Sequence, residues 1–177
     1  MKTQGRLLAR YLASAPQGEI TWLGVREQKK APMTVLSAVR AMSGQGLEGD
    51  HKAHTNNGSS RQITLINAED IHAISLLLKR DAIDPALLRR NVVVSGMNLH
   101  ALRYQRLRIG NTAEVEIRAH CHPCARMEKA LGDGAVLAMY QHAGYCAVVV
   151  ESGEIRVGDK VTLLPTSSST SVNPNNR

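Results

Sequence analysis

Aromatic residues are almost missing from this chain of 177 residues, which has no Phe, one Trp and four Tyr. Its core must therefore be aliphatic, and with 43% hydrophobic residues the chain is long enough to bury such a core in one domain. Proteins that bind single-stranded nucleic acid stack bases on aromatic side chains. We therefore expect no nucleic-acid partner, although the net charge is +7.

Cysteines and long apolar runs are also scarce. Three cysteines, an odd number, argue against a secreted disulfide scaffold. No run reaches the roughly 18–20 apolar residues that a membrane-spanning helix needs. The basic N-terminus lacks the apolar segment of a secretory signal, although its lack of acids before Glu19 resembles a transit peptide. We expect a cytoplasmic protein with no membrane partner, whose positive charge suits an anionic ligand such as a phosphate.

Short strands dominate the sequence pattern. Strands are predicted over residues 19–25, 34–41 and 62–66 and within the segment RRNVVVSG. Two further pairs of strands are predicted, one around the turn at Gly110-Asn111 and one around Gly153. Helices are predicted in the connections, from the N-cap Asn67 to about Arg80, over Asp84–Leu88, over Pro123–Leu131 with Pro123 in the first turn, and over Ala135–His142. The pattern predicts a mainly β fold, a closed or nearly closed β-barrel with helical insertions.

The chain is predicted to be one domain with two extensions. Residues 1–18 are expected to form a helical extension and residues 19–164 the β-barrel domain. Residues 165–177 are low in complexity and are expected to be a disordered tail.

Two of the three cysteines lie in the segment His120-Cys121-His122-Pro123-Cys124. A structural zinc site typically needs two separated pairs of ligands. The second pair is missing, because Cys146 stands alone in an apolar strand and no matching pair is formed by the remaining histidines, His51, His54, His72, His100 and His142. A redox dithiol normally places its first cysteine at the helix start, whereas here Cys124 takes that position.

A single reactive cysteine is the third interpretation. The helix start and the nearby Arg118 and Arg126 favour a thiolate at Cys124, which would be a good soft ligand for a transition metal. A loop cysteine without a role is the alternative, and the segment alone does not decide between them.

Candidate ligand-binding residues lie elsewhere in the sequence. Gly46, Gly49 and Asp50 form a glycine-rich loop, in which positive φ and close backbone approach suit a phosphate or a ring. Arg61 and the run 89–91 stand where strands are predicted to begin. Arginine pairs strongly with phosphate, so these positions suit an anion pocket, with ordinary turns and a solvated rim as the alternative.

Taken in order, several segments resemble the MOSC domain, which occurs at the C-terminus of molybdenum cofactor sulfurases. The matching segments are GLEGDHKAH, RQITLI, RRNVVVSGMNL, RIGNTAEVEI, HPC and GEIRVGDKV. They cover about residues 19–164, and the resemblance is to the small stand-alone bacterial members. It implies a β-barrel of the MOSC and pyruvate-kinase-barrel type and the molybdenum cofactor (molybdopterin) as ligand.

The resemblance also assigns site residues. The family's cysteine falls on Cys124, which it makes the catalytic residue and the molybdenum ligand. The cofactor-binding positions that it implies are Asp50, Arg61, Arg89, Arg90 and Asn91. The family's R-x-N-like element here reads Arg89-Arg90-Asn91, so the choice between the two arginines stays open. Cys121 stands where the family pattern requires no cysteine.

Two functions are implied by the resemblance. The leading hypothesis is a molybdenum-dependent oxidoreductase that reduces small N-hydroxylated substrates, such as hydroxylaminopurines, with electrons from a reductase partner. The alternative is a sulfur carrier that receives a persulfide on Cys124 from a sulfur donor protein, with Cys121 to resolve it, for cofactor or metal–sulfur cluster assembly. The aminotransferase-like domain of the full sulfurases has no counterpart here, and so we do not expect pyridoxal phosphate.

Overall fold

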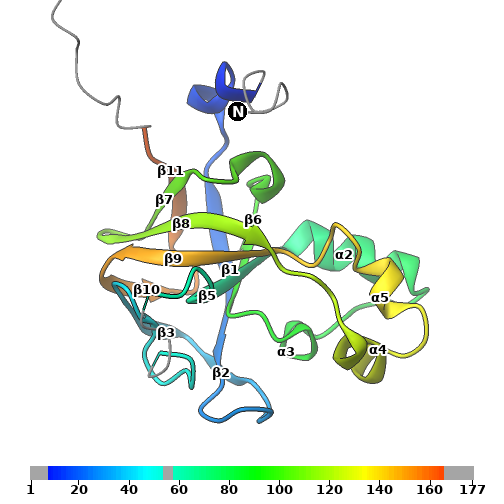
Figure 1. Ribbon diagram of the computed structural model, residues 1–177. Coiled ribbons are helices and arrows are strands. Elements are labelled where there is room, and N and C mark those ends of the chain that lie inside the picture. Colours follow the sequence, from blue (N-terminus) through cyan, green and yellow to red (C-terminus); the bar gives the residue numbers. More distant parts are fainter. Residues whose placement is uncertain (1–7, 54–57, 166–177) are drawn as a thin grey trace, which may run out of the picture.

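The computed structural model describes residues 8–53 and 58–165 (Figure 1). Its strands are β1 (Gly18–Val25), β2 (Thr34–Leu36), β3 (Ala38–Met42), β4 (Gly46–Leu47), β5 (Ile63–Asn67), β6 (Val92–Ser95), β7 (Arg106–Ile109), β8 (Ala113–His120), β9 (Tyr145–Glu151), β10 (Gly153–Arg156) and β11 (Lys160–Leu163). Its helices are α2 (Ala68–Leu77), α3 (Pro85–Leu88), α4 (Ala125–Leu131) and α5 (Ala135–Ala138), with the 3-10 helices η1 (Leu12–Ser14) and η2 (Leu99–Leu102).

Seven of these strands close into a barrel. Hydrogen bonds link them in the order β11-β7-β8-β9-β5-β6-β1, and β1 pairs again with β11 to complete the ring. The β5–β6 pair is parallel, and the other pairs around the ring are antiparallel. β2 extends the sheet beyond β1, and β10, β3 and β4 form a separate sheet. The predicted mainly β fold, a closed or nearly closed barrel, is confirmed, and the ring of strands is closed.

Two hydrophobic cores meet at strands β5 and β6. Successive side chains of a strand point to opposite faces. Leu65, Val92 and Val94 therefore join the core formed by the barrel strands, whereas Ile66 and Val93 join a second core with residues of α2, α3, α4 and α5. Figure 1 shows α2, α4 and α5 gathered on one side of the barrel. Burial on both faces explains why these strands have no polar–apolar alternation.

Two predicted helices end earlier than expected. α2 ends at Leu77 rather than near Arg80, and the helix predicted over Ala135–His142 covers only Ala135–Ala138. Lys79 and Gln141 have positive φ angles of 53° and 69°, a left-handed backbone that cannot continue a helix.

Other boundaries also shift. The strand predicted over residues 34–41 is broken at Ser37 into β2 and β3, which belong to different sheets. Pro123 precedes α4 rather than lying in its first turn, because Cys124 has an extended backbone and is the N-cap. Asn67 is the N-cap of α2, as predicted, but its side chain donates to the carbonyls of Val94 and Met97 instead of capping the helix.

The chain before the barrel is only partly described. Leu12–Ser14 form a 3-10 helix, and β1 begins at Gly18. Residues 1–7 of the predicted helical extension, and the predicted tail from residue 166 onward, lie outside the described residues. Of the helices in the described ranges, none combines the length and apolarity needed to cross a membrane.

Candidate functional site

The predicted site residues that precede β5 and β6, Arg61 and the segment 89–91, lie at one end of the barrel. Leu23, near the end of β1, pairs with Val92 at the start of β6, and β6 runs parallel to β5. The end of β1 and the starts of β5 and β6 therefore lie side by side. This arrangement brings Arg26, which follows β1, to the segment 89–91.

Asp50 and Asn91 form a buried hydrogen-bonded pair. Asp50 is 3% exposed, and its carboxylate accepts from the backbone N–H groups of Arg26 and Lys52 and from Asn91 Nδ2. Asn91 also donates to the carbonyl of Gly24 and accepts from the backbone N–H and hydroxyl of Thr64. Both side chains are thus occupied by the protein itself, and they hold the backbone around Arg26.

The glycine-rich loop before Asp50 packs against the backbone of the chain itself. Gly46 and Gly49 have φ angles of 128° and 77°, as the sequence predicted for this loop. A Cβ at Gly46 would lie 2.8 Å from the carbonyl oxygen of Gln62. The close approach that glycine permits at position 46 is therefore to the chain's own backbone.

Arg90 and Arg61 differ in burial. Arg90 is buried, and its guanidinium donates to the carbonyls of Ala143 and Leu88 at 2.7 and 3.0 Å. Arg61 is exposed, and its charge lowers the pKa of Cys146. The charge of Arg90 also lowers the pKa of Arg26, which belongs to the arginine group described next.

Arg26, Arg89 and Arg126 form a group of mutually repelling charges, and Arg89 lies within electrostatic reach of Cys124. Burial lowers the pKa of Arg26, the charge of Arg89 lowers it further, and Asp50 opposes both. Burial and the charge of Arg126 lower the pKa of Arg89, whereas a negative charge on Cys124 raises it. Three cations thus lie close to one another, and their mutual repulsion favours an anionic ligand.

Two buried nitrogens in this group lack acceptors. Among the described residues, Arg26 Nε and Arg89 Nη2 are the buried side-chain atoms without a hydrogen-bond partner. Arg89 Nη1 is fixed on the carbonyl of Ala31 at 3.1 Å, and the Arg89 backbone is left-handed, with φ 57°. Cys124 is exposed, and its sulfur makes no capping hydrogen bond to the first turn of α4. The group can therefore bind an anion at the arginines and a soft metal at the thiol.

Arg26 was not predicted from the sequence. It lies in the segment WLGVREQ, where an arginine after a strand is indistinguishable from a surface charge. The signal that was available is the position of Arg26 directly after a strand. Only the pairing of β1 with β6 places Arg26 beside Arg89.

Cys121, which directly follows β8, lies beside Cys146 in the neighbouring strand β9. Their sulfur atoms are 3.2 Å apart, which the sequence did not indicate because 25 residues separate them. The hydrogen bond that Cys121 donates, together with the charges of Arg61, Lys52 and Arg90, lowers the pKa of Cys146 to about 7. The same bond and burial raise the pKa of Cys121. Cys146 is thus the thiol of this pair that ionises more easily.

Mild oxidation with diamide should join Cys121 to Cys146 as the main product. The two sulfurs need to close from 3.2 Å to the roughly 2.05 Å of a disulfide, while diamide takes up the two electrons and two protons. Trypsin cleaves after Arg118, Arg126 and Arg156, so this disulfide links two peptides, whereas a Cys121–Cys124 disulfide closes a loop within one. Non-reducing mass spectrometry distinguishes them.

The control for this oxidation is Cys124→Ser, which should leave the linked peptides unchanged. Cys146→Ser should remove them. A dominant loop within the peptide that holds Cys121 and Cys124 would contradict the expectation.

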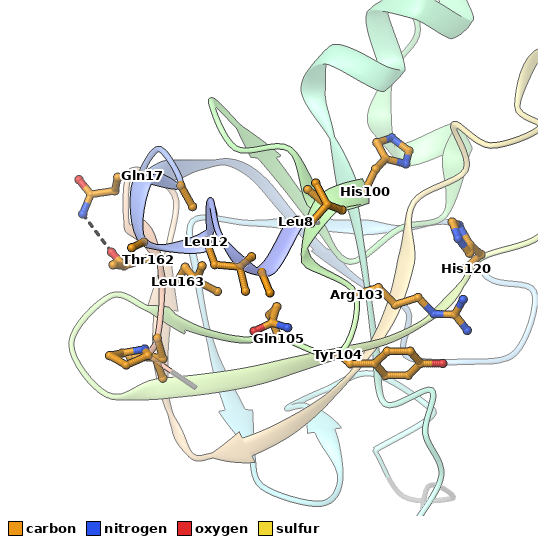
Figure 2. A pocket seen from close by; sticks show the side chains of 16 residues that line it. Leu8, Leu12, Gln17, His100, Arg103, Tyr104, Gln105, His120, Thr162 and Leu163 are labelled. Atoms are coloured by element: carbon orange, nitrogen blue, oxygen red, sulfur yellow. Dashed lines mark hydrogen bonds between the residues drawn. The ribbon is translucent and has the colours of Figure 1, made fainter. Parts of the chain in front are cut away.

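A large cavity lies elsewhere on the barrel. It has a volume of about 1340 Å³ and is bordered by the segment before β1, by η2 and by β11. Figure 2 shows His100, Arg103 and His120 on the same side of this cavity, opposite Gln17 and Thr162. All six predicted site residues are in the described ranges, and none of them lines it. The cavity and the arginine group are therefore separate features.

Comparison with known proteins identifies related folds. The YUAD protein from Bacillus subtilis superposes with a TM-score of 0.73 at 20% sequence identity, covering 83% of this chain and 95% of its own. YiiM from Geobacillus stearothermophilus has a TM-score of 0.67 at 15% identity, covering 86% and 77%. YiiM from Escherichia coli has a TM-score of 0.62 at 14% identity, covering 87% and 73%.

At these identities the solved structures establish the shared fold. No match was found among curated proteins. A family model described as the MOSC domain matches residues 50–162, more than half of the chain, and includes Asp50, the segment 89–91 and Cys124. The chain therefore belongs to the MOSC domain family.

Proposed function

We propose that this protein binds the molybdenum cofactor beside Cys124 and reduces small N-hydroxylated substrates with electrons from a reductase partner. The observation that carries the proposal is the pair of buried nitrogens, Arg26 Nε and Arg89 Nη2, that have no acceptor among the described residues. Buried donors are costly when they are unpaired, so a ligand with several oxygens would complete the site. A phosphate supplies such oxygens. Membership of the MOSC family supports the molybdenum cofactor as the source of that phosphate.

The residues divide into two roles in this proposal. Arg26, Arg89 and Arg126 hold the phosphate, and the thiolate of Cys124, a soft donor, ligates molybdenum. Asp50 and Asn91 are positioning residues, because their polar atoms bind the backbone beside Arg26 and the end of β1. The hydrogen bonds of Arg90 to two carbonyls assign it a similar supporting role.

The proposed reaction converts an N-hydroxyl group, two electrons and two protons into an amine and water. The bound cofactor supplies the two-electron oxygen chemistry. This chain binds and orients that group, and its net charge of +7 steers an acidic reductase toward it. We place this activity in the cytoplasm, where thiols such as Cys124 stay reduced.

The test is to purify the protein from a host that makes the cofactor and to measure molybdenum and oxidised-pterin fluorescence. The wild type should carry molybdenum in nearly equal amount to the protein and should reduce a hydroxylaminopurine when a reductase supplies electrons. Cys124→Ser should lose the metal and the activity. Cys121→Ser, a change three residues away in the same segment, is the matched control and should keep both.

Wild-type protein without molybdenum or pterin would sink this proposal. The alternative of a sulfur carrier then has its own readout, because Cys124 is exposed and accessible to a donor protein. Transfer of a persulfide from a cysteine desulfurase returns the donor's thiol and adds the mass of one sulfur atom to Cys124. Mass spectrometry of the wild type and of Cys124→Ser would detect that adduct.

A further inference from the structure

A second buried polar cluster lies apart from the arginine group. Asp70, in the first turn of α2, is 7% exposed and accepts hydrogen bonds from two histidines. His100 Nε2 lies 2.8 Å from Asp70 Oδ2, and His142 Nδ1 lies 2.7 Å from Asp70 Oδ1. The three residues come from α2, from η2 and from the loop before β9, so the cluster joins three separate segments.

We propose that Asp70, His100 and His142 bind a divalent transition-metal ion of the zinc type. Their donor atoms, one carboxylate oxygen and two imidazole nitrogens, all lie within 4.8 Å of one another. Bonds of roughly 2.0–2.1 Å in a tetrahedral site place such atoms about 3.4 Å apart, so modest ring rotations assemble the site. Imidazole ligands suit zinc, cobalt or nickel, whereas magnesium and calcium prefer oxygen.

His100 Nδ1, the ring nitrogen that faces away from Asp70, has a hydrogen-bond partner of the kind that a metal-binding histidine needs. His100 Nδ1 lies 3.0 Å from the hydroxyl of Tyr145, which is 1% exposed. A metal on Nε2 requires the proton of His100 to sit on Nδ1. The Tyr145 hydroxyl accepts that proton's hydrogen bond as readily as it donates its own, so both tautomers of His100 are satisfied. Such an outer partner commonly orients a metal-binding histidine.

The cluster is open enough for a metal ion to enter. The side chains of His100 and His142 are 34% and 35% exposed, whereas that of Asp70 is 9% exposed. His100 also lines the large cavity of Figure 2. Three protein ligands leave a fourth position of a tetrahedral metal for water or for a ligand in that cavity. The ion would also cross-link three segments and so stabilise the fold.

The test is to titrate the metal-free full-length protein with Co²⁺. Wild-type protein should show the visible absorption of a tetrahedral cobalt site with nitrogen and oxygen ligands, without the near-ultraviolet charge-transfer band of a cobalt–thiolate bond. Zn²⁺ should displace the cobalt and raise the melting temperature, because it binds only the folded state. His100→Gln and His142→Gln should each abolish both effects.

The matched control is His72→Gln, which removes an exposed histidine on the same helix and should leave both effects unchanged. Far-ultraviolet circular dichroism verifies that each variant is folded. Tyr145→Phe keeps all three ligands and should weaken cobalt binding by about tenfold. Wild-type protein without the visible bands, or bands that persist in His142→Gln with a thiolate signature, would overturn the proposal and assign the metal to the cysteines.

Discussion

Replacing Asn91 by alanine should lower the free energy of unfolding by about 3–4 kcal/mol. The side chain is 5% exposed and makes four hydrogen bonds, to Gly24, Asp50 and Thr64. Alanine leaves the Gly24 carbonyl, one oxygen of Asp50 and the Thr64 N–H short of partners in a buried region. A buried group that loses its partner costs about 1–3 kcal/mol, and the charged oxygen of Asp50 is the most costly of them.

Urea unfolding, followed by the fluorescence of Trp22, measures this loss, because Trp22 is the single tryptophan of the chain. Asn111→Ala is the control, since Asn111 is exposed in the turn between β7 and β8, and it should change stability by less than about 0.5 kcal/mol. A variant at position 91 that is as stable as the control would mean that Asn91 is not the centre of the buried network.

Replacing Arg26 by methionine should have opposite effects on stability and on ligand binding. In the absence of ligand, the folded protein should become more stable by about 1–2 kcal/mol, because methionine removes a guanidinium that burial and the charge of Arg89 disfavour. Binding of an anion should weaken by about tenfold or more, since one charge-assisted hydrogen bond is lost. Such opposed signs are typical of a residue retained for binding rather than for folding.

Two measurements separate these effects. Urea unfolding of the metal-free protein gives the stability, and calorimetric titration with inorganic phosphate at low salt gives the affinity. Arg40→Met changes an exposed arginine on β3 and should alter neither. If Arg26→Met destabilised the ligand-free protein and bound phosphate as tightly as the wild type, Arg26 would be a structural residue and the anion site would lie elsewhere.

Local sequence patterns accounted for most of the elements of this protein. Branched residues and turn glycines predicted β7 and β8 around Gly110-Asn111, and Asn67 correctly marked the start of α2. Helix ends were predicted less well, because the left-handed backbone of Lys79 and Gln141 has no clear signature in those residue types. Ser37 divides one apolar run between two sheets, and that division depends on which strands pair.

The sequence by itself determined the family, the mainly β barrel fold and the place of Cys124 at the start of a helix, because each depends on short segments whose order along the chain is fixed. Only the tertiary structure decided which distant residues contact one another. It placed Arg26 next to Arg89, Cys146 next to Cys121, and His100 and His142 around Asp70. These partners are 25 to 72 residues apart in the sequence, so no local spacing predicts their contacts. Barrel closure brings them together, since strand pairing fixes distances that the linear chain leaves free.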